Sequence, residues 1–178
     1  TNPGGNTLSS AGTPMPHMTV AAFNIDTDEE CTYGVRGELR VVSPCVMQGY
    51  YQNESATNSF FRIDSSGNRW GCTGDIGYVN EAGEVFVLGR ATDSYLSADG
   101  QRVYLFDIEN TLLKHKEIAQ CKAINVCVNG GSVPVAHLVL DNTAQVNQQG
   151  IIVALAQQCA NSLPKHSVPV AYKIRDSF

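Results

Sequence analysis

Short runs of alternating apolar and polar residues fill the first half of the chain. A period of two, interrupted by clusters of glycine, asparagine, aspartate and serine, is typical of β-strands joined by turns. The pattern predicts strands over residues 18–24, 38–42, 59–63, 76–79 and 85–88. We therefore expect this half to form a small twisted β-barrel or sheet.

One turn in this half decides where two charged residues lie. Residues 80–83 (NEAG) separate the last two expected strands, and a glycine can adopt the positive φ that a tight turn requires. The turn folds the strand that leaves Asp75 back toward Arg90. Both side chains are therefore expected at the same end of one β-hairpin.

The periodicity changes after Arg90, where longer segments alternate between helical and β-branched patterns. Asp107 is expected in the first turn of a helix, where an acidic group is favourable. Residues 129–131 (NGG) predict a hairpin between two strands. The elements predicted for this half are a helix over residues 106–116, strands over 123–128 and 133–140, a helix over 148–162 and a strand over 168–174.

Together these elements predict an α+β protein with two parts. The first part, residues 1–89, is expected to be β-barrel-like, and the second, residues 90–178, a small α+β domain with a short sheet and two or more helices. The division is placed in residues 90–100, which are polar and poor in large apolar side chains.

Composition narrows the class of protein. The chain has 178 residues, of which 43% are hydrophobic, and this is enough for a buried core. The net charge is −5 and the basic residues are scattered, which argues against a nucleic-acid surface. No apolar run approaches the roughly 18 residues of a spanning helix, and the chain has no basic start followed by an apolar stretch. We expect a cytoplasmic protein without a membrane partner.

Cysteine and histidine spacing gives no sign of a metal site. The six cysteines include no C-x-x-C pair, and the four histidines form no H-x-H or H-x-x-x-H pair. Most of the cysteines lie in apolar, strand-like runs, so buried reduced thiols are the preferred interpretation. A disulfide framework is the alternative.

Asp75 and Arg90 together suit a nucleotide. A carboxylate can accept hydrogen bonds from two vicinal ribose hydroxyls, and a guanidinium offers a planar fork to phosphate or ribose oxygens. The simpler alternatives are that Asp75 is an exposed acid stabilising a turn, and that Arg90 is a surface residue paired with Asp93 or Glu84. Thr73 is interpreted as a structural hydroxyl beside the acid or as a further contact.

A series of motifs in fixed order extends this interpretation over nearly the whole chain. The motifs are GTPMP at residues 12–16, GELRVVSPCVMQGY at 37–50, TGD at 73–75, GR at 89–90 followed by Asp93, GQRV at 100–103, DIE at 107–109 and LPKHSVP at 163–169. The series resembles the carboxyl-terminal part of the adenylate-forming superfamily, which includes acyl-CoA synthetases, luciferases and the adenylation domains of peptide synthetases.

The resemblance implies a role for each residue of the predicted site. Asp75 would be the ribose-binding carboxylate, Arg90 a phosphate or ribose contact, and Thr73 a neighbour in the nucleotide site. Thr92, with Asp93, would be the hinge on which residues 90–178 move as a lid domain. The parent enzyme would use ATP or AMP, Mg²⁺ and coenzyme A.

Motifs that the family needs for catalysis are missing from the chain. There is no glycine-rich phosphate loop ending in Pro-Lys, no Y-G-x-T-E segment and no P-x-x-x-x-G-K near the end. Residues 9–14 imitate the phosphate loop only faintly, because they lack the lysine. The chain also begins with Thr1. We therefore expect a fragment, truncated before the catalytic lysine, with no catalytic residue and no tightly bound nucleotide, which depends on the remainder of the parent enzyme.

Two departures from the family pattern narrow the expected activity. Thr92 stands where these enzymes typically carry Asp or Lys, and residues 90–100 are one longer than the common spacing, with Leu96 and Ser97 around the place of the usual lysine. This weakens the resemblance to peptide-synthetase adenylation domains. The preferred function is an acyl- or aryl-CoA ligase that joins a small carboxylic acid to coenzyme A or to a carrier thiol. A non-catalytic binding module that reuses the fold is the alternative from another class.

Overall fold

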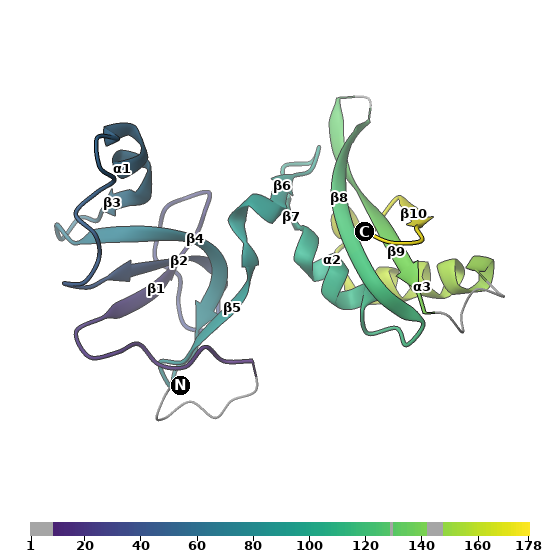
Figure 1. The fold of residues 1–178 in the computed structure, drawn as a ribbon, viewed down its shortest axis with the longest axis horizontal. Helices are drawn as coiled ribbons and strands as arrows, with labels where there is room; N and C mark the ends of the chain where they lie inside the picture. Colours follow the sequence, from purple (N-terminus) through teal and green to yellow (C-terminus); the bar gives the residue numbers. More distant parts are fainter. Residues whose placement is uncertain (1–8, 129, 142–147) are drawn as a thin grey trace. The chain divides into compact units, whose positions relative to one another are not determined.

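The structure is a computed structural model, and it describes residues 9–128, 130–141 and 148–178 (Figure 1). The chain divides into two compact units, Thr1–Ala91 and Thr92–Phe178. Each unit has its own sheet and its own buried cluster of side chains. The two units are therefore described one at a time.

The first unit is built on one five-stranded antiparallel sheet. Its strands are β1 (Thr19–Phe23), β2 (Gly37–Val42), β3 (Phe61–Ile63), β4 (Arg69–Val79) and β5 (Val85–Arg90). They follow the order β1-β2-β4-β3, and β5 also pairs with β4 (Figure 1). The long β4 is therefore the centre of the unit. Over the described residues the strands form an open sheet rather than a closed barrel.

Two segments of this unit depart from the sequence prediction. The strand expected over residues 76–79 begins seven residues earlier, at Arg69, because its glycines leave no alternating pattern of side chains to detect. The strand expected over residues 59–63 is wrong in its first half, because Glu54–Phe60 form a short helix, α1, and only Phe61–Ile63 form β3. The helix begins at Asn53, whose side chain accepts a hydrogen bond from the backbone of Ala56 at 3.0 Å. Asparagine is a favoured residue at this position, and the segment after it is too short to show a helical period.

Arg40 is the main charged group buried in the first unit. Only 4% of its surface is exposed, and its guanidinium lies 4.5 Å from the ring centre of Phe23. It donates hydrogen bonds to Asp28 at 2.5 Å and to Glu38 at 3.0 Å. Both carboxylates therefore compensate for the loss of hydration of this cation.

Replacing Arg40 by alanine is expected to destabilise the first unit by about 3 kcal/mol, because Glu38 would keep a partly buried charge without its partner. Trp70, the single tryptophan, packs edge-on against Phe23 in this unit, so its fluorescence reports unfolding of this unit alone. Urea unfolding followed by this signal measures the change. The exposed Glu81→Ala, in the same unit, is the control, with an effect below about 0.5 kcal/mol. Equal midpoints for both variants would show that the Arg40 contacts add nothing to stability.

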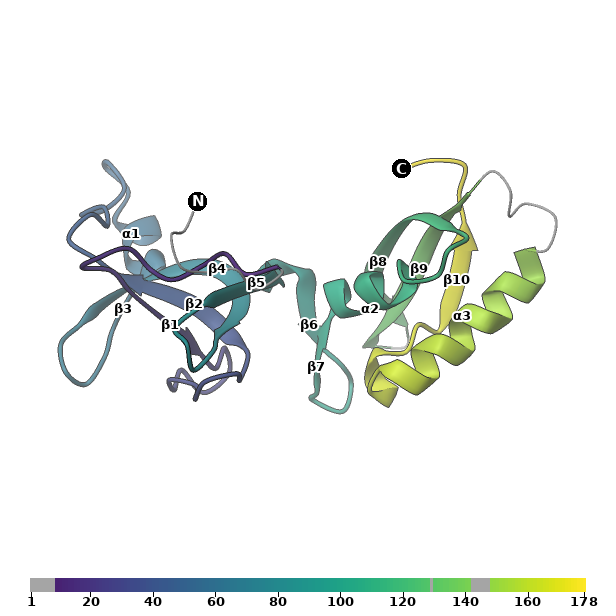
Figure 2. The same ribbon diagram turned by 90° about the horizontal axis from the view of Figure 1, so that it is seen from below.

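The second unit combines a hairpin, two helices and a three-stranded sheet. Its elements are β6 (Ser94–Leu96), β7 (Arg102–Tyr104), α2 (Leu105–Leu112), β8 (Ile118–Val128), β9 (Gly131–Leu140), α3 (Gln148–Ser162) and β10 (Ala171–Ile174). The sheet order is β10-β9-β8, with β8 antiparallel and β10 parallel to β9 (Figure 2). The parallel pair is possible because α3 lies in the connection between β9 and β10.

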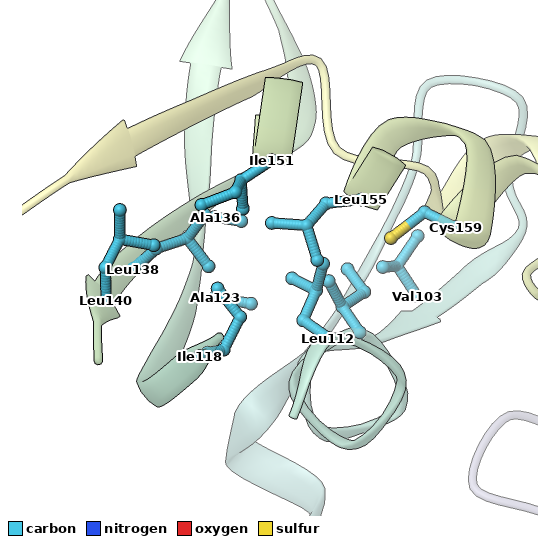
Figure 3. Close-up of a cluster of buried hydrophobic side chains, with 11 residues drawn as sticks. Val103, Leu112, Ile118, Ala123, Ala136, Leu138, Leu140, Ile151, Leu155 and Cys159 are labelled. Atoms are coloured by element: carbon cyan, nitrogen blue, oxygen red, sulfur yellow. The ribbon is translucent and has the colours of Figure 1, made fainter. Parts of the chain in front are cut away.

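Side chains from both helices and the sheet form the core of this unit. Figure 3 shows Ile151 and Leu155 of α3 pointing toward Ala136 of β9 and Leu112 of α2. Leu155, Leu112 and Ala136 are fully buried. Glu109 of α2 also accepts a hydrogen bond from the backbone of Ala123 at 2.9 Å, which joins the helix to β8.

The α+β class is confirmed, and the elements of the second unit differ from the prediction in four places. The strand expected over residues 123–128 begins at Ile118. The helix expected over residues 106–116 ends at Leu112, the last strand begins at Ala171 after a 3₁₀ turn at Lys165–Ser167, and the β6–β7 hairpin was not expected at all. Asn129, in the predicted hairpin turn, lies outside the described residues. The helix over residues 148–162 is confirmed.

The cysteines are free thiols, but most are not buried. Only Cys159 is fully buried, whereas Cys45 and Cys127 are exposed. The expectation of buried thiols is therefore wrong for most of them, because Cys45 lies in the loop between β2 and α1, and Cys127 lies in β8, where alternate side chains face opposite sides of the sheet. Within the residues that the structure describes, no helix is long and apolar enough to cross a lipid bilayer.

Candidate functional site

Asp75 and Arg90 face each other across the β4–β5 hairpin. They are register partners, and Arg90 Nη1 lies 2.6 Å from Asp75 Oδ1. The Asp75 side chain is 29% exposed and that of Arg90 is 61% exposed. The expected meeting of the two groups at one end of the hairpin is therefore observed, and both are accessible from solvent.

Thr73 contacts the backbone of Asp75 and of a neighbouring strand. Its hydroxyl donates a hydrogen bond to the carbonyl of Leu39 at 2.7 Å and accepts one from the backbone N–H of Asp75 at 3.0 Å. Its own carbonyl accepts a hydrogen bond from Arg90 Nη1 at 3.3 Å. The three predicted nucleotide-site residues, Thr73, Asp75 and Arg90, thus form one connected group.

An irregularity in the pairing of β2 with β4 determines where the group of Thr73, Asp75 and Arg90 lies. Between the pairs Glu38–Ile76 and Arg40–Cys72, β2 contributes one residue and β4 contributes three, the Thr-Gly-Asp motif. The motif is therefore a bulge, a feature that re-aims side chains and often lies beside functional sites. Gly74 in its middle has a φ of +72°, which glycine adopts without strain.

The chemistry available at the group is binding rather than catalysis. It presents a carboxylate as acceptor and a guanidinium as donor, which fits a ligand with vicinal hydroxyls and a phosphate. The adjacent thiol of Cys72 is unsuited to act as a nucleophile, because burial, helped by the Glu38 carboxylate, raises its pKa. In the described part of the chain no three His, Cys, Asp or Glu side chains come together as metal ligands.

The two predicted hinge residues lie directly after β5. Thr92 and Asp93 belong to a single 3₁₀ turn, Ala91–Asp93, and the division between the two units falls between Ala91 and Thr92. Thr92 is exposed and Asp93 half-buried. The turn separates the last strand of one unit from the first strand of the other.

A concave region in the second unit was missed by the sequence analysis. It encloses about 390 Å³ and has Lys165 and His166 on its wall, near the β6–β7 turn. At that turn, a hydrogen bond from the Ser97 hydroxyl lowers the pKa of Asp99. Its lining residues are Ser97, Ala98, Asp99, Ser132, Val133, Pro134, Lys165, His166, Val168 and Val170. They come from three distant stretches, so no local motif could have identified the cavity.

The family of the second unit follows from a match to a family model. Residues 107–178 match the AMP-binding enzyme C-terminal domain. These residues belong to that family. The match covers α2 from Asp107 onward, the three-stranded sheet and α3.

Whole-chain comparisons extend the relationship beyond the C-terminal domain. The chain is 34% identical over 170 residues to a 2-succinylbenzoate–CoA ligase of Bacillus licheniformis, covering 95% of this chain and 33% of that protein. It is 31% identical to a probable 4-coumarate–CoA ligase 3 of Dictyostelium discoideum, covering 80% of this chain and 25% of that protein. The chain therefore spans about a third or less of the length of these relatives.

A solved structure gives the same relationship in three dimensions. The structure of O-succinylbenzoate coenzyme A synthetase from Bacillus subtilis in complex with AMP has a TM-score of 0.74 and 28% sequence identity, covering 97% of this chain and 33% of that one. The resemblance to the carboxyl-terminal part of adenylate-forming CoA ligases is thereby confirmed. The roles of Thr73, Asp75, Arg90, Thr92 and Asp93 stay predictions.

Proposed function

We propose that the chain is the carboxyl-terminal part of an ATP-dependent acyl- or aryl-CoA ligase. Such an enzyme activates a carboxylic acid as an acyl-adenylate and transfers the acyl group to coenzyme A or a carrier thiol. The observation that carries the proposal is the Asp75–Arg90 pair at 2.6 Å, at the end of a hairpin in a chain whose similarity to CoA ligases extends over 95% of its length. The cytoplasm is the proposed location.

Each residue of the site has a proposed role. Asp75 accepts hydrogen bonds from the ribose hydroxyls of ATP or AMP, and Arg90 binds phosphate or ribose oxygens. Residues 1–89 complete the large nucleotide-binding domain, and residues 90–178 form a lid that moves about Thr92 and Asp93. A magnesium ion would accompany the triphosphate, held mainly by phosphate oxygens rather than by residues of this chain.

The 178-residue chain alone is expected to form no acyl-adenylate. Adenylation depends on electrostatic stabilisation by a lysine and a metal-loaded phosphate loop, and the sequence contains neither motif. Isotope exchange between pyrophosphate and ATP, with fatty, aryl and amino acids as substrates, measures this step. Exchange above background from the purified chain would contradict this expectation, because it would show that adenylation does not require the lysine and the phosphate loop from another segment.

A chimera supplies the missing groups and tests the proposed function. In it, the chain replaces the matching third of the B. subtilis 2-succinylbenzoate–CoA ligase, and the rest of that enzyme is kept. The expected result is pyrophosphate exchange and thioester formation with 2-succinylbenzoate. The host enzyme lacking the matching third is the control. A folded, monodisperse chimera with no more exchange than this control would contradict the ligase and favour a non-catalytic binding module.

A further inference from the structure

Asp75 is held from two sides, by contacts of different strength. Its carboxylate pairs with Arg90, whose side chain is 61% exposed. An exposed ion pair of this kind contributes little, about 0–1 kcal/mol. On the backbone side its N–H donates to the Thr73 hydroxyl, which is half-buried and itself donates to Leu39. The hydrogen bond from the Asp75 backbone to the Thr73 hydroxyl is therefore expected to be the more stable of the two contacts.

The bulge explains why Thr73 is needed there. Because three residues of β4 stand opposite Leu39, the regular ladder is interrupted at that point. The carbonyl of Leu39, a residue that is only 3% exposed, accepts a hydrogen bond from the Thr73 hydroxyl. A buried carbonyl without a hydrogen-bond partner is costly. The Thr73 hydroxyl therefore supplies a partner for the Leu39 carbonyl of β2 and also fixes the backbone N–H of Asp75.

We propose that Thr73 is a positioning residue, which holds the Asp75 carboxylate in place while Arg90 leaves it for the bound nucleotide. This inference rests on the proposed function, in which Asp75 binds ribose and Arg90 can bind phosphate. In the free protein the Asp75 carboxylate and the Arg90 guanidinium are paired with each other. Ligand entry therefore exchanges the weak ion pair for new contacts, and the Thr73 hydroxyl prevents the bulge from collapsing during that exchange. Thr73 itself does not touch the ligand.

The first test needs no ligand. Thr73→Val keeps the shape of the side chain and removes the hydroxyl, whereas Thr73→Ser keeps the hydroxyl. Amide hydrogen exchange of the full chain, read by NMR, is expected to be about tenfold faster at Asp75 in Thr73→Val and unchanged in Thr73→Ser and Arg90→Met. Unchanged exchange at Asp75 in Thr73→Val, or equal acceleration in Arg90→Met, would overturn the inference.

The second test asks whether the effect passes through the ribose. AMP and 2′-deoxy-AMP are titrated against the full chain, with dissociation constants taken from NMR shifts. Thr73→Val is expected to weaken AMP binding about threefold to tenfold and binding of the deoxy analogue by less than about twofold. In an Asp75→Asn background, Thr73→Val is expected to add no further loss.

The outcomes separate the two ideas. Equal binding of AMP and 2′-deoxy-AMP, or no binding of either, by the wild-type chain would contradict the ribose role of Asp75 in the proposed function, while the exchange experiment still decides whether Thr73 holds Asp75. Equal losses for both nucleotides in Thr73→Val, or an equal loss in Thr73→Ser, would contradict positioning through the hydroxyl and show a general distortion of the sheet.

Discussion

Replacing Asp75 by alanine is expected to raise the ATP concentration required by the chimeric ligase about ten- to a hundredfold. The carboxylate is proposed to accept two hydrogen bonds from ribose, each worth about 1.5–3 kcal/mol at most, and water recovers part of this loss. The side chain lies at the end of a hairpin and is 29% exposed, so its removal leaves no cavity in the core. Steady-state kinetics at varied ATP measures the effect.

The kinetic result needs a stability control, because Asp75 is also the partner of Arg90. Losing this exposed ion pair is expected to cost about 1 kcal/mol or less. Thermal unfolding of the 178-residue Asp75→Ala variant, followed by Trp70 fluorescence, reports it. Asp75→Asn is the matched variant, since it keeps the size and loses the charge. Unchanged ATP kinetics together with a large loss of thermal stability would show that Asp75 is structural.

The sequence predicts an element well when one long, continuous segment carries its whole periodic pattern of apolar residues. The fifteen residues of α3 show an apolar side at helical spacing, with Ile151, Leu155 and Cys159 buried, and both ends of this helix were predicted. Helix α1 was missed because it spans only seven residues and buries none of them. A helix without a buried face leaves no periodic pattern to detect.

The meeting of Asp75 and Arg90 was predictable because a single turn joins their strands, with Gly83 at a φ of +77°. The bulge at Thr73 was not, because it arises from pairing with Leu39, which is 34 residues away in the chain. Hydrophobic alternation gives the faces of a strand but no count of the residues opposite each other. The role of Thr73 therefore became visible only once β2 and β4 were paired.

Replacing Thr92 by proline is expected to slow one half-reaction of the chimeric ligase at least tenfold more than the other, because fixing φ biases the hinge by more than about 1.4 kcal/mol. The resemblance implies that the small domain rotates between adenylation and thiol transfer, so a few dihedrals after Arg90 must absorb the change. Thr92 lies in the 3₁₀ turn Ala91–Asp93. A proline there also disfavours the helical backbone of Ala91, so it opposes the turn seen in this structure.

Rapid-quench measurements separate the two steps, with adenylate formation and thioester formation followed individually. Thr92→Ala is the control, since it changes the side chain and leaves φ free. Thr92→Asp restores a residue typical of the family and is expected to keep both steps within about threefold, because an exposed substitution seldom changes stability by more than about 0.5 kcal/mol. Small and equal effects of proline on both steps would place the pivot elsewhere. The β6–β7 turn, residues 97–101, would then be the next segment to test, since the resemblance predicts one extra residue between Arg90 and Gly100, and Gly100 has a φ of +75°.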